Sequence, residues 1–426
     1  MNNYHSVGRC LVESLKGALT RAPVIVLTGA RQTGKTTLVC DLLGQERRYL
    51  TLDDFETADR AEQNPDALLD TSLPLTIDEV QRAPQLLLAI KRRVDLKRIP
   101  GQFLLTGSAN LALMRKVSES LSGRAIYKTL LPMTASEAVG QGGCGVWSEL
   151  ITNPESFRDR TVMQMDISRQ ILTGGYPPVV FSQGDVERSE WLEGYVRTYL
   201  ERDLQMLSSI DQLADFRRLL RMVALRTGKL MNQSEMARDA GLTQPTAHRY
   251  LGLLETSHLL VRLPAYAVNK TKRLIKAPRL FLCDSGLACH LAGLHSVSQL
   301  RTGDLAGFLL ENAVLQDLYA WRETLSPRPE VLYWRTTSGK EVDFVIEWED
   351  KLFPIEVKQS LRARLSDTEG LTAFLDEYAD MATHGILLYT GKTVERLTSR
   401  IWAIPLTLAL NLHAGPVKTL VAKGET

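Results

Sequence analysis

The chain of 426 residues is too long for a single ordinary hydrophobic core and should form roughly two to four domains. Its 44% hydrophobic and 23% charged residues are typical of a globular protein. Its five cysteines are scattered without CxxC spacing and suggest neither a disulfide framework nor a zinc site. The N-terminus lacks an apolar signal segment, and no apolar run approaches the length of about 18 residues that crosses a bilayer. We therefore expect a cytoplasmic protein without a membrane segment.

Positive charge is concentrated in the middle of the chain, although the whole sequence has a net charge of only +2. Between Arg217 and Arg279, 13 Lys or Arg residues stand against Glu235, Asp239 and Glu255, which is a net charge of +10. Such a block favours a polyanionic partner, and DNA is the partner that we expect. The alternative is an ordinary surface that faces acidic neighbours in the same molecule.

Residues 1–145 have the pattern of an α/β domain. The β-branched run VIVLTGA at 24–30 ends before a helical stretch, TLVCDLLGQ, which predicts a strand, a loop and a helix. Similar apolar runs at 48–54, 73–79 and 101–108 alternate with helical segments. This alternation predicts a parallel sheet covered by helices, which the small-residue stretch GQGGCG brings to an end.

The loop after the first strand, GARQTGKT, matches the phosphate-loop pattern G-x-x-x-x-G-K-[ST] in full. Gly29 and Gly34 let backbone N–H groups turn toward a phosphate. Lys35 would contact the β- and γ-phosphates, and the Thr36 hydroxyl would bind magnesium. ATP and Mg²⁺ are therefore the expected substrate and cofactor. The residues expected to contact the nucleotide are Gly29, Ala30, Arg31, Gln32, Thr33, Gly34, Lys35, Thr36 and Thr37.

Further catalytic candidates follow the later strands of this domain. Asp78 ends the run LPLTIDE, where a carboxylate can hold magnesium, and Glu79 is placed to activate the attacking water. Ser108, at the end of FLLTGS, is expected to sense the γ-phosphate from the neighbouring strand. Arg115 and Arg124 are candidate arginine fingers, and both are also compatible with an ordinary surface position.

The middle of the chain predicts a helical connector at 150–230 and a winged helix-turn-helix at 231–285. Gly241 separates two helical patterns, and Thr243 as N-cap with Pro245 in the first turn begins the second. Two apolar strand-like runs follow, and the basic stretch NKTKRLIKAPR between them would form the wing.

A helix-turn-helix places its second helix in the major groove of DNA, and basic wing residues hold phosphates with little dependence on sequence. The side chains expected nearest to DNA are Gln244, Thr246, His248 and Arg249 on the helix, and Lys270, Lys272, Arg273, Lys276 and Arg279 on the wing. The alternative is a winged helix used for packing or subunit contact. His258 and His290 lie in apolar stretches and are expected to be core or edge residues.

Residues 300–395 predict the order αβββαβ, with 396–426 as a C-terminal extension. Asp343 and Glu356 lie on adjacent predicted strands, in EVDFVIEW and LFPIEVKQ, and can share a magnesium or manganese ion. Lys358 projects to the same side as Glu356, where it can orient water or stabilise charge on a phosphate.

Glu311, on the preceding helix, completes an E…D…ExK set that resembles the PD-(D/E)XK nuclease-like superfamily. The metal ligands that this resemblance implies are Glu311, Asp343 and Glu356. The same residues are also compatible with plain ion pairs, and nuclease-like folds can lose activity while they keep their shape. Whether the site cleaves DNA is left open by the sequence.

Nearly the whole chain resembles the prokaryotic AAA-type ATPases that carry a C-terminal domain of unknown function. The resemblance rests on GARQTGKTTL, YLTLDD, IDEVQ, LLTGSAN, SLSGR, GGYPP, TYLERD, PTAHRYLGLLE, LPAY, KAPRLFLCDSGLA and LLENAV. It implies an ATP-binding domain, a winged helix and a nuclease-like C-terminal domain. Because such ATPases usually complete their sites with an arginine from a neighbouring subunit, it also implies a homo-oligomer.

Three functions agree with these patterns. The first is an ATP-driven machine that acts on branched or broken DNA and carries a nuclease-like domain. The second is a DNA-binding regulator or defence sensor that ATP switches between bound and free states, with an inactive nuclease-like domain. The third is a switch whose basic face binds an acidic protein partner.

Overall fold

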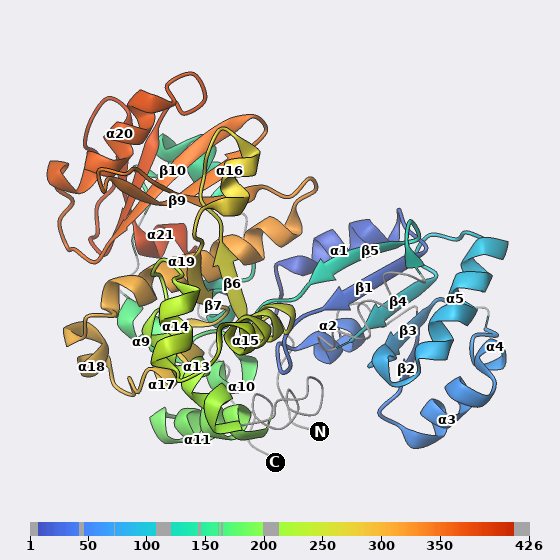
Figure 1. Cartoon of the computed structure of the whole chain (residues 1–426). Coiled ribbons are helices and arrows are strands. Elements are labelled where there is room, and N and C mark those ends of the chain that lie inside the picture. Colours follow the sequence, from blue (N-terminus) through green and yellow to red (C-terminus); the bar gives the residue numbers. More distant parts are fainter. Residues whose placement is uncertain are drawn as a thin grey trace, which may run out of the picture.

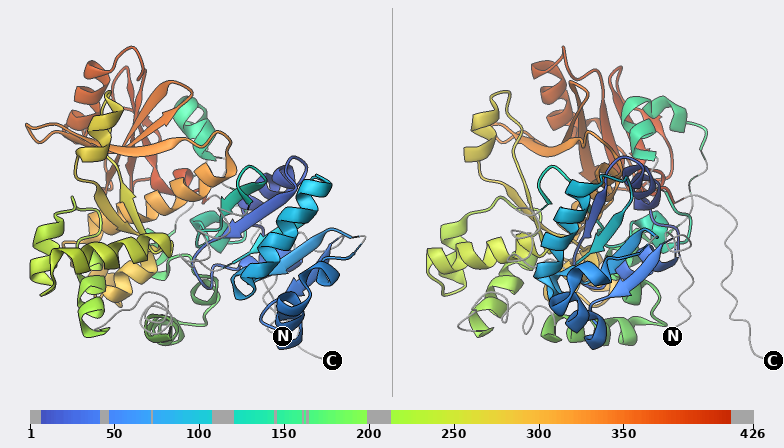
Figure 2. Two further views of the ribbon diagram at one scale, coloured as in Figure 1. Left: turned by 45° about the vertical axis from the view of Figure 1, so that its right-hand side comes forward. Right: turned by 90° about the vertical axis from the view of Figure 1, so that its right-hand side faces the viewer.

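The structure is a computed structural model that describes residues 7–41, 47–71, 73–107, 121–143, 146–160, 162, 165–198 and 213–412. An N-terminal α/β unit lies beside a larger body that the middle and C-terminal segments form together (Figure 1). The left view of Figure 2 shows the same division, and in the right view the N-terminal unit lies in front of the larger body.

Five parallel strands form the N-terminal sheet in the order β2-β3-β4-β1-β5. The strands are β1 (Val24–Thr28), β2 (Arg48–Thr51), β3 (Leu75–Asp78), β4 (Phe103–Thr106) and β5 (Ala125–Thr129). The helices along this stretch are α1 (Leu11–Leu19), α2 (Lys35–Asp41), α3 (Phe55–Gln63), α4 (Pro65–Leu68), the short 3₁₀ helix η2 (Val80–Arg82) and α5 (Pro84–Leu96). The predicted parallel sheet is confirmed.

Alternate residues of β1 pack into separate cores on the two faces of this sheet. Val24 and Val26 join the cluster that contains α5, whereas Ile25 and Leu27 join the cluster that contains α1 and α2. Side chains of a strand point to opposite faces in turn, so a strand covered on both sides is apolar throughout. This arrangement explains the unbroken run VIVLT, and it places the C-terminal ends of β1, β3 and β4 at one edge.

The middle segment is mostly helical, as predicted. Its elements before the helix-turn-helix are α7 (Ala135–Ala138), α8 (Val146–Thr152), η3 (Pro154–Phe157), α9 (Ile167–Thr173), α10 (Pro177–Val180), α11 (Asp185–Tyr195) and α13 (Leu213–Leu225). Then follow α14 (Gln233–Asp239), α15 (Gln244–Thr256), β6 (Leu260–Leu263), α16 (Lys270–Ile275), β7 (Arg279–Leu282), α17 (Ser285–Leu291) and α18 (Val297–Thr302). β6 and β7 pair antiparallel.

The turn between α14 and α15 has the predicted chemistry. Gly241 has a φ of 66°, a conformation that glycine adopts without steric cost. The Thr243 hydroxyl accepts a hydrogen bond from the Thr246 N–H at 3.3 Å, and a proline stands at the start of α15. The predicted N-cap is therefore confirmed. The short helix α16, which Asn269 caps, lies where we expected an irregular wing.

The C-terminal sheet has six strands in the order β12-β13-β11-β10-β9-β8. Its elements are α19 (Ala306–Thr324), β8 (Glu330–Arg335), β9 (Glu341–Trp348), β10 (Lys351–Lys358), η5 (Leu365–Thr368), α20 (Glu369–Glu377), β11 (Gly385–Tyr389), β12 (Glu395–Arg396), β13 (Ile401–Pro405) and α21 (Leu406–Ala409). β8, β9 and β10 pair antiparallel, while β10, β11 and β13 pair parallel. β13 corrects the expected boundary at residue 395, because residues 401–405 complete the sheet beside β11.

α19 lies between the two parts of the molecule (Figure 1). Its Gln316 side chain donates to the Met133 carbonyl at 2.9 Å, and its Glu323 accepts from the Thr129 N–H at 3.2 Å. Lys128 donates to the Glu323 carbonyl at 2.8 Å. The end of β5 and the segment that follows it are thus bound to the first helix of the C-terminal domain.

Two further features bear on the environment of the protein. Among the described residues, no helix combines the length and apolarity required to cross a membrane. Cys40, Cys283 and Cys289 form no disulfide, whereas Cys10 is disulfide-bonded, which the scattered cysteines of the sequence did not suggest.

Candidate functional site

The phosphate loop follows β1 directly and leads into α2. Gly29 has a φ of +146°, and a Cβ there would lie 2.2 Å from the Leu130 carbonyl oxygen. Gly34 has a φ of +89°, also in the range that favours glycine. Both glycines are therefore required by the backbone, and the loop has the strand–loop–helix context that the sequence predicted.

Lys35 is buried at the start of α2, with its ammonium turned into the loop. Its Nζ donates to the Ala30 carbonyl at 2.9 Å and to the Gly29 carbonyl at 3.2 Å. Burial lowers the pKa of Lys35 to about 8, and the carboxylates of Glu79 and Asp78 oppose this shift. A bound phosphate would add negative charge beside the ammonium and favour its charged form.

Asp78 is the centre of a hydrogen-bond cluster at the carboxyl edge of the sheet. Its Oδ2 accepts from the Thr36 hydroxyl at 2.9 Å and from the Tyr49 hydroxyl at 2.9 Å, and its Oδ1 accepts from the Thr106 hydroxyl. The structure thus brings together Thr36 and Asp78, the two predicted magnesium ligands of this domain. Mg²⁺ prefers oxygen ligands of this kind together with phosphate oxygens, so these residues fit the ion.

Glu79 follows Asp78 with a φ of 56°, a left-handed conformation that is uncommon for residues other than glycine. Its N–H donates to the Thr106 hydroxyl at 3.4 Å, and its carboxylate accepts from the Gln81 side chain. Thr106 and Tyr49 were missed by the sequence-based prediction. Thr106 is the last residue of β4, the strand whose end we used to select Ser108, so its position at a strand end could have identified it. No feature of the sequence pointed to Tyr49.

The remaining catalytic candidates of this domain are less well placed. Ser108 and Arg115 lie outside the described residues. Arg124 pairs with Asp95 through two hydrogen bonds of 2.5 and 2.9 Å. It precedes β5, whose first residue pairs with Val24 at the start of β1, so Arg124 lies at the edge of the sheet opposite the phosphate loop. It cannot reach the nucleotide site of its own chain.

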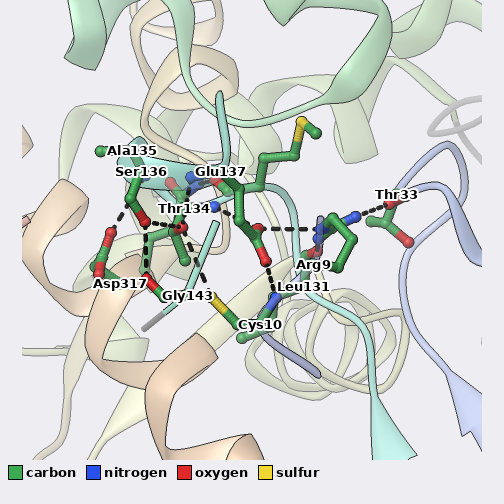
Figure 3. Close-up of polar contacts among 12 residues, drawn as sticks. Arg9, Cys10, Thr33, Leu131, Thr134, Ala135, Ser136, Glu137, Gly143 and Asp317 are labelled. Atoms are coloured by element: carbon green, nitrogen blue, oxygen red, sulfur yellow. Dashed lines mark hydrogen bonds and ion pairs between the residues drawn. The ribbon is translucent and has the colours of Figure 1, made fainter. Parts of the chain in front are cut away.

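A buried arginine outside every predicted motif contacts the phosphate loop (Figure 3). Arg9 donates to the Thr33 carbonyl at 2.8 Å and to the Leu131 carbonyl at 2.6 Å, and its Nε pairs with Glu137 at 3.0 Å. Close by, Asp317 of α19 accepts from the Ala135 N–H at 3.2 Å and from the Trp147 indole at 2.9 Å. Burial raises the pKa of Asp317 to about 7.

His258 is a second side chain outside the loop that responds to it electrostatically. It lies between α15 and β6 with a φ of 57°. Burial, and then the charge of Lys35, lower the pKa of His258 to about 4. The histidine that we expected to be a core or edge residue thus lies within the electrostatic influence of the phosphate-loop lysine.

In the C-terminal domain, the predicted nuclease-like residues do converge. Asp343 on β9 accepts from the Val357 N–H of β10 at 2.9 Å, and Lys358 donates to Glu356 at 2.6 Å. Glu311 lies on α19, and all three carboxylates are buried. We call Glu311, Asp343, Glu356 and Lys358 the carboxylate cluster.

Arg279, from β7, enters this cluster. Its Nη1 pairs with Asp343 at 3.2 Å, its Nη2 pairs with Glu311, and its Nε donates to the Gly228 carbonyl at 2.5 Å. Among the described residues, no group of three His, Cys, Asp or Glu side chains is arranged to hold a metal ion. The expected shared metal is therefore not confirmed, because a guanidinium supplies the positive charge between two of the carboxylates.

Glu356 remains incompletely satisfied in this arrangement. Its Oε2 is buried without a hydrogen-bond partner. Burial and the neighbouring Asp343 carboxylate raise its pKa to about 8, while Lys358 opposes the shift. Burial and Asp343 likewise raise the pKa of Glu311. The raised pKa values of Glu356 and Glu311 mean that these two side chains keep their protons to a higher pH than a free glutamate does.

The residues predicted to contact DNA divide into two groups. Gln244, His248 and Arg249 are exposed on α15, Thr246 is half-buried, and Lys270, Lys272 and Lys276 are exposed at α16. Arg273, in contrast, is buried and pairs with Glu347 at 2.5 Å and Glu330 at 3.0 Å. Arg273 and Arg279 therefore hold the hairpin to the C-terminal domain and are not available for phosphates, which corrects both predictions.

Comparisons with known protein families divide the chain into three matched regions. Residues 21–139 match an AAA domain, residues 164–298 match a domain of unknown function (DUF8612), and residues 306–409 match another (DUF4143). The AAA match covers the phosphate loop and Asp78. It supports an ATPase, and the third match supports a C-terminal domain that continues past residue 395.

Two uncharacterized proteins, from Mycobacterium tuberculosis and Mycobacterium bovis, are each 31% identical to this chain over 411 residues, which is 96% of this chain and 85% of theirs. An uncharacterized protein of Haemophilus influenzae is 22% identical over 395 residues, 87% of this chain and 90% of its own. Among solved structures, a Walker-type ATPase of Pyrococcus abyssi is similar at 14% identity and a TM-score of 0.39, over 66% of this chain and 94% of that one.

Proposed function

This chain belongs to the same family as the uncharacterized mycobacterial proteins, and we propose that it is a magnesium-dependent ATPase that works as a switch on DNA. The observation that carries the proposal is the Thr36–Asp78 contact at 2.9 Å beside the phosphate loop, which joins the two expected magnesium ligands. Thr36 and Asp78 would hold the ion, which would neutralise charge on the phosphates. Glu79 would orient the attacking water.

The DNA part of the proposal rests on the order of elements from α13 onward. Three helices followed by an antiparallel pair, β6 and β7, agree with a winged helix-turn-helix, and α15 would be its recognition helix. At least six of the 13 basic residues at 217–279 pair with carboxylates, namely Arg218, Arg226, Arg238, Arg262, Arg273 and Arg279. The basic surface is therefore narrower than the net charge of +10 implied, and it includes the exposed Arg249 of α15 and Lys270, Lys272 and Lys276 at α16.

The proposed switch is favoured over a constantly active nuclease by Arg279. Its guanidinium occupies the space between Glu311 and Asp343, and it belongs to the hairpin that follows the recognition helix. Movement of that hairpin would withdraw the arginine from the carboxylate cluster. We therefore place metal-dependent cleavage second, as an activity that requires Arg279 to leave.

One set of measurements tests the main proposal. ATP turnover is measured with and without duplex, forked, junction and single-stranded DNA, and binding to the same DNAs is followed by gel shift. DNA-stimulated turnover and nucleotide-dependent DNA affinity are expected. Turnover that no DNA changes, together with no gel shift on any of the four, would leave an acidic protein as the partner to seek.

The second candidate has its own test. With Mg²⁺ or Mn²⁺, wild type should nick one of these DNAs only weakly, and Arg279→Met should nick it more strongly. Asp343→Ala or Lys358→Ala should abolish nicking and leave ATP turnover intact. If neither wild type nor Arg279→Met cleaves any of the four DNAs, the domain is a binding or assembly platform.

A further inference from the structure

Arg9 lies just before α1, outside the phosphate loop in sequence, yet one nitrogen of its guanidinium contacts that loop at Thr33. Each of its three nitrogens donates a hydrogen bond, to Glu137, to the Thr33 carbonyl and to the Leu131 carbonyl. The side chain is buried. Ordering a long, charged side chain in this way costs conformational entropy and desolvation, so its contacts must offset a considerable penalty.

The contact with Thr33 determines the orientation of one peptide unit of the loop. A trans peptide is planar, so the carbonyl of Thr33 and the N–H of Gly34 point in opposite directions. Because Arg9 holds the carbonyl, the Gly34 N–H is directed away from the guanidinium. Successive backbone N–H groups turned inward form the anion-binding nest of such a loop. By holding the Thr33 carbonyl, Arg9 thus orients the Gly34 N–H on the opposite side of the same peptide, where it can donate to a phosphate.

The conformation of Gly34 explains why the Thr33–Gly34 peptide needs a residue that fixes its orientation. Its φ of +89° allows a peptide orientation that other residues seldom adopt, and glycine is also the most mobile residue of a chain. An added Cβ at Gly34 would lie 3.6 Å from Nη1 of Arg9, so the guanidinium packs directly against this position. A mobile peptide next to Lys35 is therefore held from one side by a fixed group.

Arg9 is itself fixed by Glu137 (Figure 3). The Glu137 carboxylate accepts from the Thr134 N–H at 2.9 Å and from the Cys10 N–H at 2.5 Å, in addition to Arg9. In return, the Glu137 N–H donates to the Thr134 hydroxyl at 3.2 Å, which closes a capping box at the start of α7. The carboxylate has little freedom to move.

We propose that Arg9 is a positioning residue of the ATP site, which holds the Thr33–Gly34 peptide with its N–H toward the nucleotide phosphates. Arg9 touches no phosphate; it acts through the loop. Loss of Arg9 should therefore weaken nucleotide binding. The groups expected to perform hydrolysis should stay in place, because they lie at the C-terminal end of β3 and the N-terminal end of α2. The inference rests on ATP binding at this loop.

The test separates nucleotide affinity from turnover. Arg9→Met is compared with wild type for the dissociation constant of a fluorescent ATP analogue, for KM and for kcat. Loss of a charged hydrogen bond that orients a binding group should raise the dissociation constant and KM by roughly tenfold to a hundredfold, with kcat at saturating ATP nearly unchanged. Arg9→Lys should restore part of the affinity, since it keeps a buried donor.

Two controls protect the result. Arg9→Met leaves Glu137 buried without its partner, so the double variant Arg9→Met with Glu137→Gln removes the pair together and preserves the fold. The double variant should show the same loss of affinity. Arg92→Met removes an arginine of the same domain whose exposed side chain pairs with Asp66, and it should bind as wild type does.

The outcomes are distinct. If wild type binds no nucleotide, the ATPase function and this inference fail together. If the double variant is folded and binds the analogue as tightly as wild type, only the inference is overturned, and Arg9 is a structural pin. A fall in kcat without a change in KM would also overturn it, because Arg9 would then act on the chemical step.

Discussion

At the scale of single residues, the nucleotide site depends on side chains at the carboxyl ends of strands. Asp78 ends β3 and accepts from Thr36, Tyr49 and Thr106, which come from α2, β2 and β4. Glu79 then turns left-handed, a strained conformation for glutamate that its surroundings must maintain. Strain of this kind is concentrated at functional sites, and here it places a carboxylate next to Thr36 and Asp78, the proposed magnesium ligands.

Substitutions of Lys35 and Glu79 should separate ATP binding from ATP hydrolysis. Lys35→Ala removes the ammonium that meets the phosphates, so it should lose ATP binding or turnover. Glu79→Gln keeps the shape but cannot accept a proton, and it should bind ATP while turnover falls about a hundredfold or more. Radioactive filter binding and phosphate release measure the two steps. Wild-type turnover in both variants would contradict the assignment.

Glu356 predicts how stability depends on pH. The native residue keeps its proton to a pH of about 8, whereas the ordinary glutamate pKa of 4.5 applies once the chain is unfolded. Between these pH values the native state binds more protons than the unfolded state, so stability falls as pH rises. Glu356→Gln should reduce this fall by roughly 1 to 3 kcal/mol.

Urea unfolding at about pH 5.5 and pH 8, with a chelator present, measures the effect. Glu311 titrates in the same direction and remains in the variant, so the fall should become smaller and not vanish. Identical pH dependence in wild type and Glu356→Gln would mean that Glu356 is ionised in the native protein.

At the scale of elements, the hairpin β6–β7, with α16 between its strands, carries both buried and exposed basic residues. Its buried arginines, Arg273 and Arg279, bind carboxylates of the C-terminal domain. Its lysines at α16, Lys270, Lys272 and Lys276, are exposed to solvent. The hairpin is therefore the element that physically joins the proposed DNA surface to the carboxylate cluster.

Neutralising the exposed lysines tests the DNA side of this hairpin. The triple change of Lys270, Lys272 and Lys276 to Gln should weaken DNA binding similarly on all sequences and lower the salt dependence by about one unit of slope for each lost phosphate contact. Gel shifts across a salt series measure both quantities.

Arg273→Gln is the matched comparison on the buried side of the hairpin. It breaks a buried ion pair, so it should lower the free energy of unfolding by roughly 3 to 5 kcal/mol, whatever its effect on DNA. If the triple lysine variant binds DNA as wild type does, the exposed face serves another partner.

At the scale of the whole molecule, one hydrophobic cluster runs from the helical middle through the hairpin into the C-terminal sheet, and it includes Ala30 of the phosphate loop. α19 adds polar contacts to the segment after β5. The nucleotide loop and the C-terminal sheet are thus joined by continuous packing, an arrangement that agrees with the proposed switch.

The position of Arg124 has a consequence for the assembly of the protein. Arg124 lies at the sheet edge opposite its own nucleotide site, so an arginine finger at this position could serve only a neighbouring chain. We predict a homo-oligomer that forms or tightens with ATP, measured by light scattering coupled to gel filtration. Arg124→Ala should then bind ATP normally and lose turnover. A monomeric mass with ATP at full turnover would contradict the prediction.

The sequence by itself determined the features that local physics controls. The glycines of the phosphate loop, the N-cap of α15 and the apolar runs of β1 and β3 follow from backbone sterics, local hydrogen bonds and the periods of strand and helix. The positions of Asp78 and Lys358 were also predicted correctly, because Asp78 ends a strand and Lys358 follows from the alternation of side chains along one.

Only the tertiary structure decided which charges are buried and with whom. Arg9 meets Glu137 across 128 positions, and Arg279 meets Asp343 across 64. Composition showed a basic block, yet Arg273 and Arg279 turn inward, since their carboxylate partners come from strands and a helix far along the chain. A side chain's charge is written in the sequence, but its pKa, its partner and its access to solvent are properties of the packed neighbours.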